Sequence, residues 1–298
     1  MKNQLYSFLE AKGFLNQRQF GFRPGHSTED ALASLSLFIN KALDLGLVPA
    51  AILLDIKKAF DSIDHGILLG KIEHIGVRGE ALRWFRSYLS SRRVYIGDDP
   101  LNDTVVNFGV PQGSILGPLL FLVHVNDLSR VLNPNSRTSR CCKLCCDPEI
   151  SSNDHESDEL VAFADDTTMV SCDTDMSALQ SKLEVILEET YIWMDANRFV
   201  INVDKSCVLF FSRIGPLRPE VSGITTSRGT IRRPKTGCAR YLGVILDEKL
   251  SFVHHIHAVE LKLSRNLGII RKLKHEFPKK KTLHLLRLVE SASTRAEM

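Results

Sequence analysis

Apolar residues recur at helical spacing in several segments of the chain. In the longest segment, from Asp175 to Asn197, the apolar side chains share one face, which predicts a helix packed on a core. Ser27 or Thr28 can cap another helix, because a hydroxyl accepts a hydrogen bond from a free amide at a helix start. Helices are expected, in chain order, at the start of 1–20, from Ser27 or Thr28 to about 45, at 64–75, around 84–89, at 115–128, at 175–197, and over 252–291 with a break at Pro278.

Short, continuous apolar runs between these helices predict strands, since buried strands are brief and apolar. Such runs lie at 50–55, 160–164, 167–170, 207–211 and 240–246, with weaker ones near Val94 and Val105, and 213–236 is expected to be a loop with a weak hairpin. Strands and helices mixed in this way predict an α+β fold in which helices cover one face of a sheet.

Acidic residues stand at the ends of three of the predicted strands. Asp165 and Asp166 would lie at the tip of a hairpin, and Asp55 ends an apolar strand. Two carboxylates at the mouth of a core have raised pKa values unless a positive charge neutralises them, and a divalent metal is the usual partner. The alternative is a polar turn, since Asp is common in turns.

Composition favours a folded protein. The chain has 298 residues, of which 44% are hydrophobic and 24% charged, enough for one large or two smaller domains. No uncharged apolar run approaches the roughly 18 residues of a membrane span, and the N-terminus lacks the apolar stretch of a signal peptide, so we expect an intracellular protein that does not enter membranes. The seven cysteines are an odd number, and Cys172, Cys207 and Cys238 stand singly in apolar patterns, as buried reduced cysteines do.

Charge is distributed unevenly, although the net charge is only +3. Acids gather over 147–175, whereas Lys and Arg gather over 213–240 and 262–287. A polyanion could lie along the second half of the chain, or these segments are simply solvated helix and loop faces.

Two loops and a cysteine-rich segment add candidate chemistry. Arg23 lies in a Gly-rich loop, where a guanidinium could bind phosphate oxygens or lie on the surface. Gln112 and Gly113 lie in a turn before an apolar helix, where the backbone can approach a ligand. The segment over 130–159 contains Cys141-Cys142 and Cys145-Cys146, which indicates either a zinc site or an inserted loop.

Six blocks in a fixed order resemble the reverse transcriptase domain of non-LTR retrotransposons, of the LINE-like, jockey type. They cover the chain from about residue 15 to 275. The blocks are Gln19-Phe-Gly-Phe-Arg-Pro-Gly-His-Ser-Thr28, Leu54-Asp-Ile-Lys-Lys-Ala-Phe-Asp61, Gly109-Val-Pro-Gln-Gly-Ser-Ile-Leu-Gly-Pro118, Phe163-Ala-Asp-Asp-Thr167, Asn202-Val-Asp-Lys205 and Tyr241-Leu-Gly-Val-Ile-Leu246.

The resemblance implies a right-hand polymerase with an antiparallel palm sheet backed by helices. It implies partial fingers at 1–50, a palm at 51–246 that includes part of the fingers and a Cys-rich insertion at about 130–159, and a partial helical thumb at 247–298. Basic helices after residue 252 would follow the template–primer backbone. The short fingers, the insertion and the short thumb lead us to expect a fragment of a longer protein.

The same resemblance implies an RNA-directed DNA polymerase that adds deoxynucleotides to a primer on an RNA template. Two Mg²⁺ ions, or Mn²⁺ as a substitute, would bind Asp55, Asp165, Asp166 and the Ile56 carbonyl. The remaining roles implied are sugar selection by Phe60, nucleotide binding by Arg23, Gln112 and Gly113, proton donation to pyrophosphate by Lys205, and a primer grip at Tyr241, Leu242 and Gly243. The alternative is an inactive remnant that at most binds nucleic acid.

Overall fold

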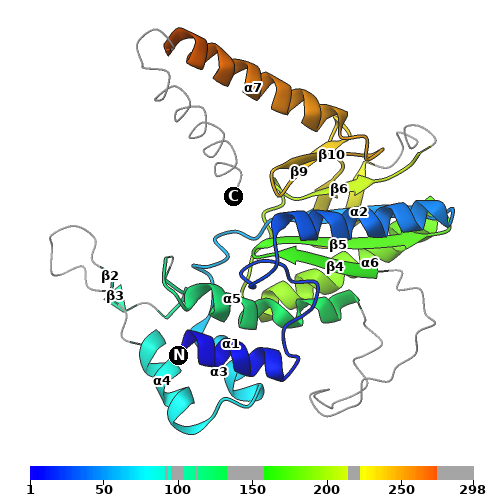
Figure 1. Ribbon diagram of the computed structural model, residues 1–298. Helices are drawn as coiled ribbons and strands as arrows, with labels where there is room; N and C mark the ends of the chain where they lie inside the picture. The colour runs from blue at the N-terminus through cyan, green and yellow to red at the C-terminus, as the bar shows by residue number, and fades with distance from the viewer. Residues whose placement is uncertain are drawn as a thin grey trace.

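The computed structural model describes residues 1–90, 93–94, 104–105, 107–111, 113–132, 158–213 and 222–273 (Figure 1). Its centre is a four-stranded sheet in the order β4-β5-β1-β6, in which every neighbouring pair is antiparallel. The strands are β1 (Val48–Leu54), β4 (Asp158–Phe163), β5 (Asp166–Asp173) and β6 (Cys207–Phe210). The prediction of an α+β fold is therefore confirmed.

One face of the sheet carries most of the helices and the larger core. Ala50, Ile52 and Leu54 alternate along β1 and point into this core, which α6 (Met176–Ala196) and α5 (Gly117–Val125) complete. The other elements of this layer are α1 (Lys2–Ala11), α3 (His65–His74), α4 (Gly79–Leu89) and the 3-10 helix η1 (Asn126–Leu132).

The opposite face of the sheet is covered as well, by α2 (Thr28–Asp44), as Figure 1 shows. Ala51 and Leu53, the alternate residues of β1, pack there against Leu35 and Ile39 of α2. The prediction of helices on one face only was thus incomplete, because a strand that is apolar at every position buries both of its faces. Ser27 caps α2 in a capping box with Asp30, as the hydroxyl at this position predicted.

In the described part of the chain, three short hairpins lie outside the central sheet. They are β2 (Arg93–Val94) with β3 (Thr104–Val105), β7 (Gly223–Thr226) with β8 (Gly229–Arg232), and β9 (Cys238–Tyr241) with β10 (Val244–Asp247). The single strand predicted over 240–246 is wrong: Tyr241 pairs with Val244, and the intervening Leu242 and Gly243 turn the chain with φ of 46° and 83°. Gly243 makes this turn easy, because glycine adopts positive φ without strain.

Helix α7 (Val253–Leu273) extends away from the sheet beyond the β9–β10 hairpin (Figure 1). No helix in the described part of the chain is long and apolar enough to cross a membrane. The predicted break at Pro278 and the predicted zinc site or inserted loop at Cys141–Cys146 lie outside the described residues.

Candidate active site

The pairing of β1 with β5 brings three acids to one end of the sheet. Leu54 pairs with Thr167, so Asp55, which follows Leu54, and Asp166, which precedes Thr167, stand at adjacent strand ends. Asp165 lies beside them in the turn between β4 and β5, where Ala164 has a φ of 58°. A positive φ at the first central residue is the backbone feature that tight hairpin turns need.

The three carboxylates influence one another. Burial, together with the negative charges of Asp165 and Asp55, raises the pKa of the Asp166 carboxyl to about 6. The Asp166 residue as a whole is nevertheless exposed, so its carboxyl remains accessible to solvent. The raised pKa of Asp166 has no basic side chain among its causes, which indicates negative charge that no cation of the protein neutralises.

Asp55 is held by the turn that precedes β6. The Asn202 Nδ2 donates to the Asp55 Oδ2 at 2.7 Å, and the Asn202 amide donates to the Asp55 carbonyl at 2.8 Å. The Asp55 amide in turn donates to the Ser206 Oγ at 3.0 Å. Asn202 begins the Asn202–Lys205 block of the resemblance, whereas no sequence pattern marks Ser206. Local spacing predicts neither contact, because the two residues follow Asp55 by 147 and 151 positions.

The backbone after Asp55 continues this pairing. Ile56 bridges Ile201, and the Lys57 amide donates to the Val200 carbonyl at 2.9 Å. The hydrogen bonds on either side of Ile56 involve the Asp55 carbonyl and the Lys57 amide, so the Ile56 carbonyl takes no part in this pairing. The structure therefore places Ile56 beside the acids, with its side chain in the core.

The acids suit a magnesium ion by their chemistry, since hard cations prefer carboxylate oxygens. In the part of the chain that the structure describes, however, no group of three or more His, Cys, Asp or Glu side chains has the arrangement of a metal site. The negative charges of the three carboxylates repel one another, and the Asp55 carboxylate accepts a hydrogen bond from Asn202. The uncompensated charge on Asp166 is the observation that fits a cation best.

The Gln19–Phe22 segment lies directly against the acidic hairpin. The Phe20 amide donates to the Ala162 carbonyl at 2.8 Å, and the buried Gln19 Oε1 accepts from the amides of Gly21 and Ala164 at 3.0 and 3.2 Å. A Cβ on Gly21 would lie 2.1 Å from the Ala164 nitrogen, so only glycine allows this approach. The sequence predicts a loop at this glycine but no role for Gln19.

Phe60 lies between two other aromatic rings. It stacks on Phe121 at a centroid distance of 4.7 Å and meets Phe22 edge-on at 5.8 Å. The Val110 amide donates to the Phe60 carbonyl at 2.9 Å, which ties the turn that contains Gly113 to the same region. Gly113 has a φ of 78°, and Gln112 lies outside the described residues.

Arg23 is held inside the protein. Its Nη2 pairs with the Glu10 Oε1 at 3.0 Å and its Nη1 donates to the Asn16 carbonyl at 2.8 Å, with the side chain only 9% exposed. The guanidinium therefore fastens α1 to the loop, and nucleotide binding by Arg23 stays a prediction that would require at least part of this contact to be given up.

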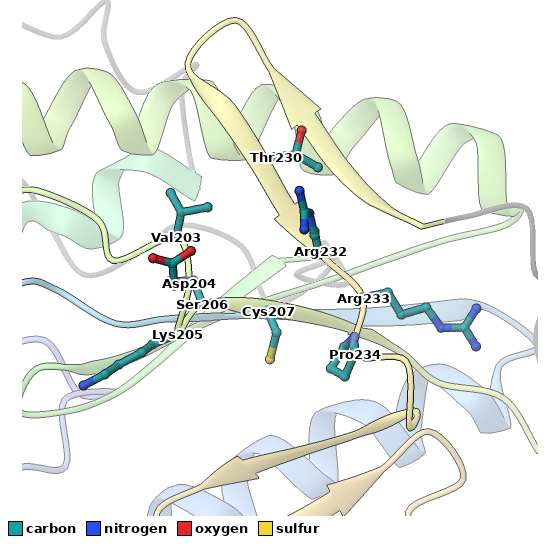
Figure 2. A pocket seen from close by; sticks show the side chains of 9 residues that line it. All are labelled: Val203, Asp204, Lys205, Ser206, Cys207, Thr230, Arg232, Arg233 and Pro234. Atoms are coloured by element: carbon teal, nitrogen blue, oxygen red, sulfur yellow. The ribbon is translucent and has the colours of Figure 1, made fainter.

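Lys205 lines a half-open pocket of 540 Å³ between the turn at 203–207 and β8 (Figure 2). Arg232 and Arg233 belong to the opposite wall, and Arg233 pairs with Glu248 through bonds of 2.5 and 2.6 Å. Figure 2 shows the Lys205 ammonium pointing away from both arginines, so these cations do not converge on one ligand. Burial raises the pKa of the Cys207 thiol in the pocket to about 11, which keeps it protonated and unreactive.

Tyr241 ends β9 beside the acidic strands. Its side chain is buried in the core that α2 covers, and burial, with a smaller contribution from the negative charge of Asp166, raises the pKa of its hydroxyl. The hydroxyl is thus close to the acidic end of β5. Leu242 and Gly243 form the adjoining turn, so the predicted primer grip is the tip of a hairpin.

A family model of reverse transcriptase (RNA-dependent DNA polymerase) matches residues 1–246. The chain belongs to the reverse transcriptase family. Its relatives include a probable RNA-directed DNA polymerase from transposon BS of Drosophila melanogaster, 27% identical over 91% of this chain and 28% of the relative. The RNA-directed DNA polymerase from mobile element jockey of the same species is 26% identical over 87% of this chain and 26% of the relative.

These relatives confirm the resemblance to reverse transcriptases of non-LTR retrotransposons. The chain spans about a quarter of the length of these curated relatives. Among solved structures, apo telomerase from Candida tropicalis, truncated from its C-terminal domain, is similar with a TM-score of 0.51 and 13% identity, over 82% of this chain and 43% of that one. At this identity the likeness shows the reverse transcriptase fold alone.

Proposed function

We propose that this chain is the RNA-directed DNA polymerase of a non-LTR retrotransposon, which adds deoxynucleotides to the 3′-hydroxyl of a primer. The observation that carries this proposal is the convergence of Asp55, Asp165 and Asp166 at one end of β1 and β5. The proposed partners are an RNA template, a DNA primer and deoxynucleoside triphosphates, and the proposed place of action is inside the cell.

The acids are proposed as the metal ligands, together with the Ile56 carbonyl. Two Mg²⁺ ions, or Mn²⁺ in their place, would supply there a lowered pKa for the primer hydroxyl and stabilisation of charge on the phosphates. Asn202 orients the Asp55 carboxylate and Ser206 fixes its backbone, as their bonds of 2.7 and 3.0 Å support. These two residues keep one ligand in place while the others stay open to solvent.

The remaining side chains are proposed to bind and select the nucleotide. The Phe60 ring would exclude the 2′-hydroxyl of a ribonucleotide, and Lys205, exposed on its turn, would give a proton to the leaving pyrophosphate. Arg23, Gln112 and Gly113 are proposed to bind the triphosphate.

The proposed domains follow the order of the chain: fingers at 1–50, palm at 51–246 and thumb from 247 onward. Tyr241, Leu242 and Gly243 would hold the primer, and the basic residues of α7 would contact the template–primer backbone through its phosphates.

A catalytically inactive remnant that at most binds nucleic acid is the second candidate. Two observations favour it: Arg23 is paired with Glu10, and the acids of the described residues are not gathered into a metal site. Such a remnant would retain the reverse transcriptase fold without the polymerase activity.

Extension of a labelled DNA primer on an RNA template, with Mg²⁺ and deoxynucleotides, separates the two candidates. The polymerase proposal expects extension by wild type and by Glu73→Gln, which removes an exposed carboxylate on α3, and none by Asp165→Asn. Wild type that extends no better than Asp165→Asn, while still binding the template–primer, would establish the remnant instead.

A further inference from the structure

Phe22 is an aromatic residue that the contacts of the fold do not explain. Its side chain is 45% exposed and it belongs to neither core, yet its φ is 59°. Bulky residues rarely adopt this left-handed backbone, and an exposed ring gains little from burial. A residue held in an unfavourable backbone conformation at a proposed site suggests a role in that site.

Among the residues that the structure describes, the ring of Phe22 has one aromatic partner, which is Phe60. The two centroids are 5.8 Å apart and the ring planes meet at 84°, the edge-on arrangement that aromatic pairs favour. The other side of the Phe60 ring stacks on Phe121, which is fully buried and is held in place by the surrounding core. Phe60 is therefore enclosed between a fixed ring of the core and a ring carried by a surface loop.

The backbone of this loop is fixed to the acidic hairpin. Gly21 lies so close to Ala164 that a Cβ would be 2.1 Å from its nitrogen, and Gln19 bonds to the Ala164 amide at 3.2 Å. Phe22 follows Gly21 directly, so its position is set relative to the turn that contains Asp165. One segment thus links the proposed metal ligands to the proposed sugar-selecting ring.

We propose that Phe22 is a positioning residue for sugar selection, which holds the Phe60 ring where it excludes a ribose 2′-hydroxyl. The inference rests on the proposed polymerase function. A ring excludes a hydroxyl only if it cannot move aside, and Phe60 is only half-buried. Without Phe22, the Phe60 ring keeps its contact with Phe121 but can tilt away on its open side.

The test measures the ratio of kcat/KM for dCTP to kcat/KM for CTP in primer extension on an RNA template. Phe22→Ala is expected to lower this ratio about three- to tenfold, the factor that loss of one aromatic pair corresponds to. Phe22→Tyr keeps the ring and should keep the ratio. Trp84→Ala, which removes an exposed ring that contacts Phe85 and Tyr88 instead, is the matched control and should also keep it.

A double-mutant cycle shows whether Phe22 acts through Phe60. Once Phe60→Ala has lowered the selectivity, adding Phe22→Ala should change the ratio no further; an additional, independent loss would overturn the proposal. Unchanged selectivity in Phe22→Ala, with active and selective wild type, would refute the inference and leave the polymerase proposal intact. Absence of extension by wild type would refute both. If Phe22→Ala does not fold, Phe22→Leu, which keeps apolar volume without a ring, serves the same comparison.

Discussion

Replacing Gly21 by alanine tests the contact between the Gln19–Phe22 segment and the acidic hairpin. The added Cβ would lie 2.1 Å from the Ala164 nitrogen and 2.9 Å from the Ala164 Cα and the Phe163 carbonyl carbon. All three are backbone atoms, which cannot rotate away as a side chain does. The segment and the hairpin must therefore move apart.

The cost follows from the hydrogen bonds that cross this contact. They are Phe20 amide to Ala162 carbonyl at 2.8 Å, Ala162 amide to Arg18 carbonyl at 3.0 Å, and Ala164 amide to Gln19 Oε1 at 3.2 Å. With about 1 kcal/mol for each of the three bonds, Gly21→Ala should lower the free energy of unfolding by about 3 kcal/mol, and any of these polar groups left buried without a partner would add to this loss. Primer extension should fall as well, because the turn that carries Asp165 moves.

Urea unfolding followed by circular dichroism measures the first effect, and primer extension under the same buffer conditions measures the second. Gly70→Ala is the matched control: Gly70 lies inside α3, and no atom lies within 4 Å of its added Cβ. That variant should be unchanged or more stable by about 0.5–1 kcal/mol, since alanine favours helix over glycine. If Gly21→Ala unfolded at the wild-type urea concentration and kept full activity, the contact described would not exist in solution.

Two further predictions concern the polar side chains of His124 and Asn202. His124 is fully buried, and among the described residues neither ring nitrogen has a hydrogen-bond partner. Burial lowers the pKa of the His124 imidazole from 6.5 to about 4. As pH falls, His124 is therefore protonated in the unfolded chain before it is protonated in the folded protein. The free energy of unfolding should therefore decline between pH 6.5 and 4, by about 2 kcal/mol at pH 5. Urea unfolding of His124→Leu should lack this decline. An equal decline in both proteins would show that His124 does not cause it. Asn202→Ala removes the hydrogen bond to Asp55 and should slow primer extension about tenfold, as loss of a hydrogen bond to a charged group implies. The control Asn40→Ala, on α2, should not slow primer extension. Equal rates for the two variants would show that Asn202 does not orient Asp55.

The sequence by itself determined several of the elements and the family. Apolar runs and helical spacing were sufficient for β1, β5, β6 and α6, because local burial patterns depend on which residues face a core. The ordered blocks were sufficient for the reverse transcriptase family, which the family model and the relatives confirm. The roles of Asp55, Asp165 and Asp166 remain predictions with a stated test.

Only the tertiary structure decided which distant residues meet. The bond from Asn202 to Asp55, the approach of Gly21 to Ala164 and the ion pair of Arg23 with Glu10 join segments that no local pattern connects. Strand register and loop packing set these contacts, and both depend on the whole core. For the same reason periodicity did not foresee that α2 covers the second face of the sheet, nor that Phe22 is held against Phe60.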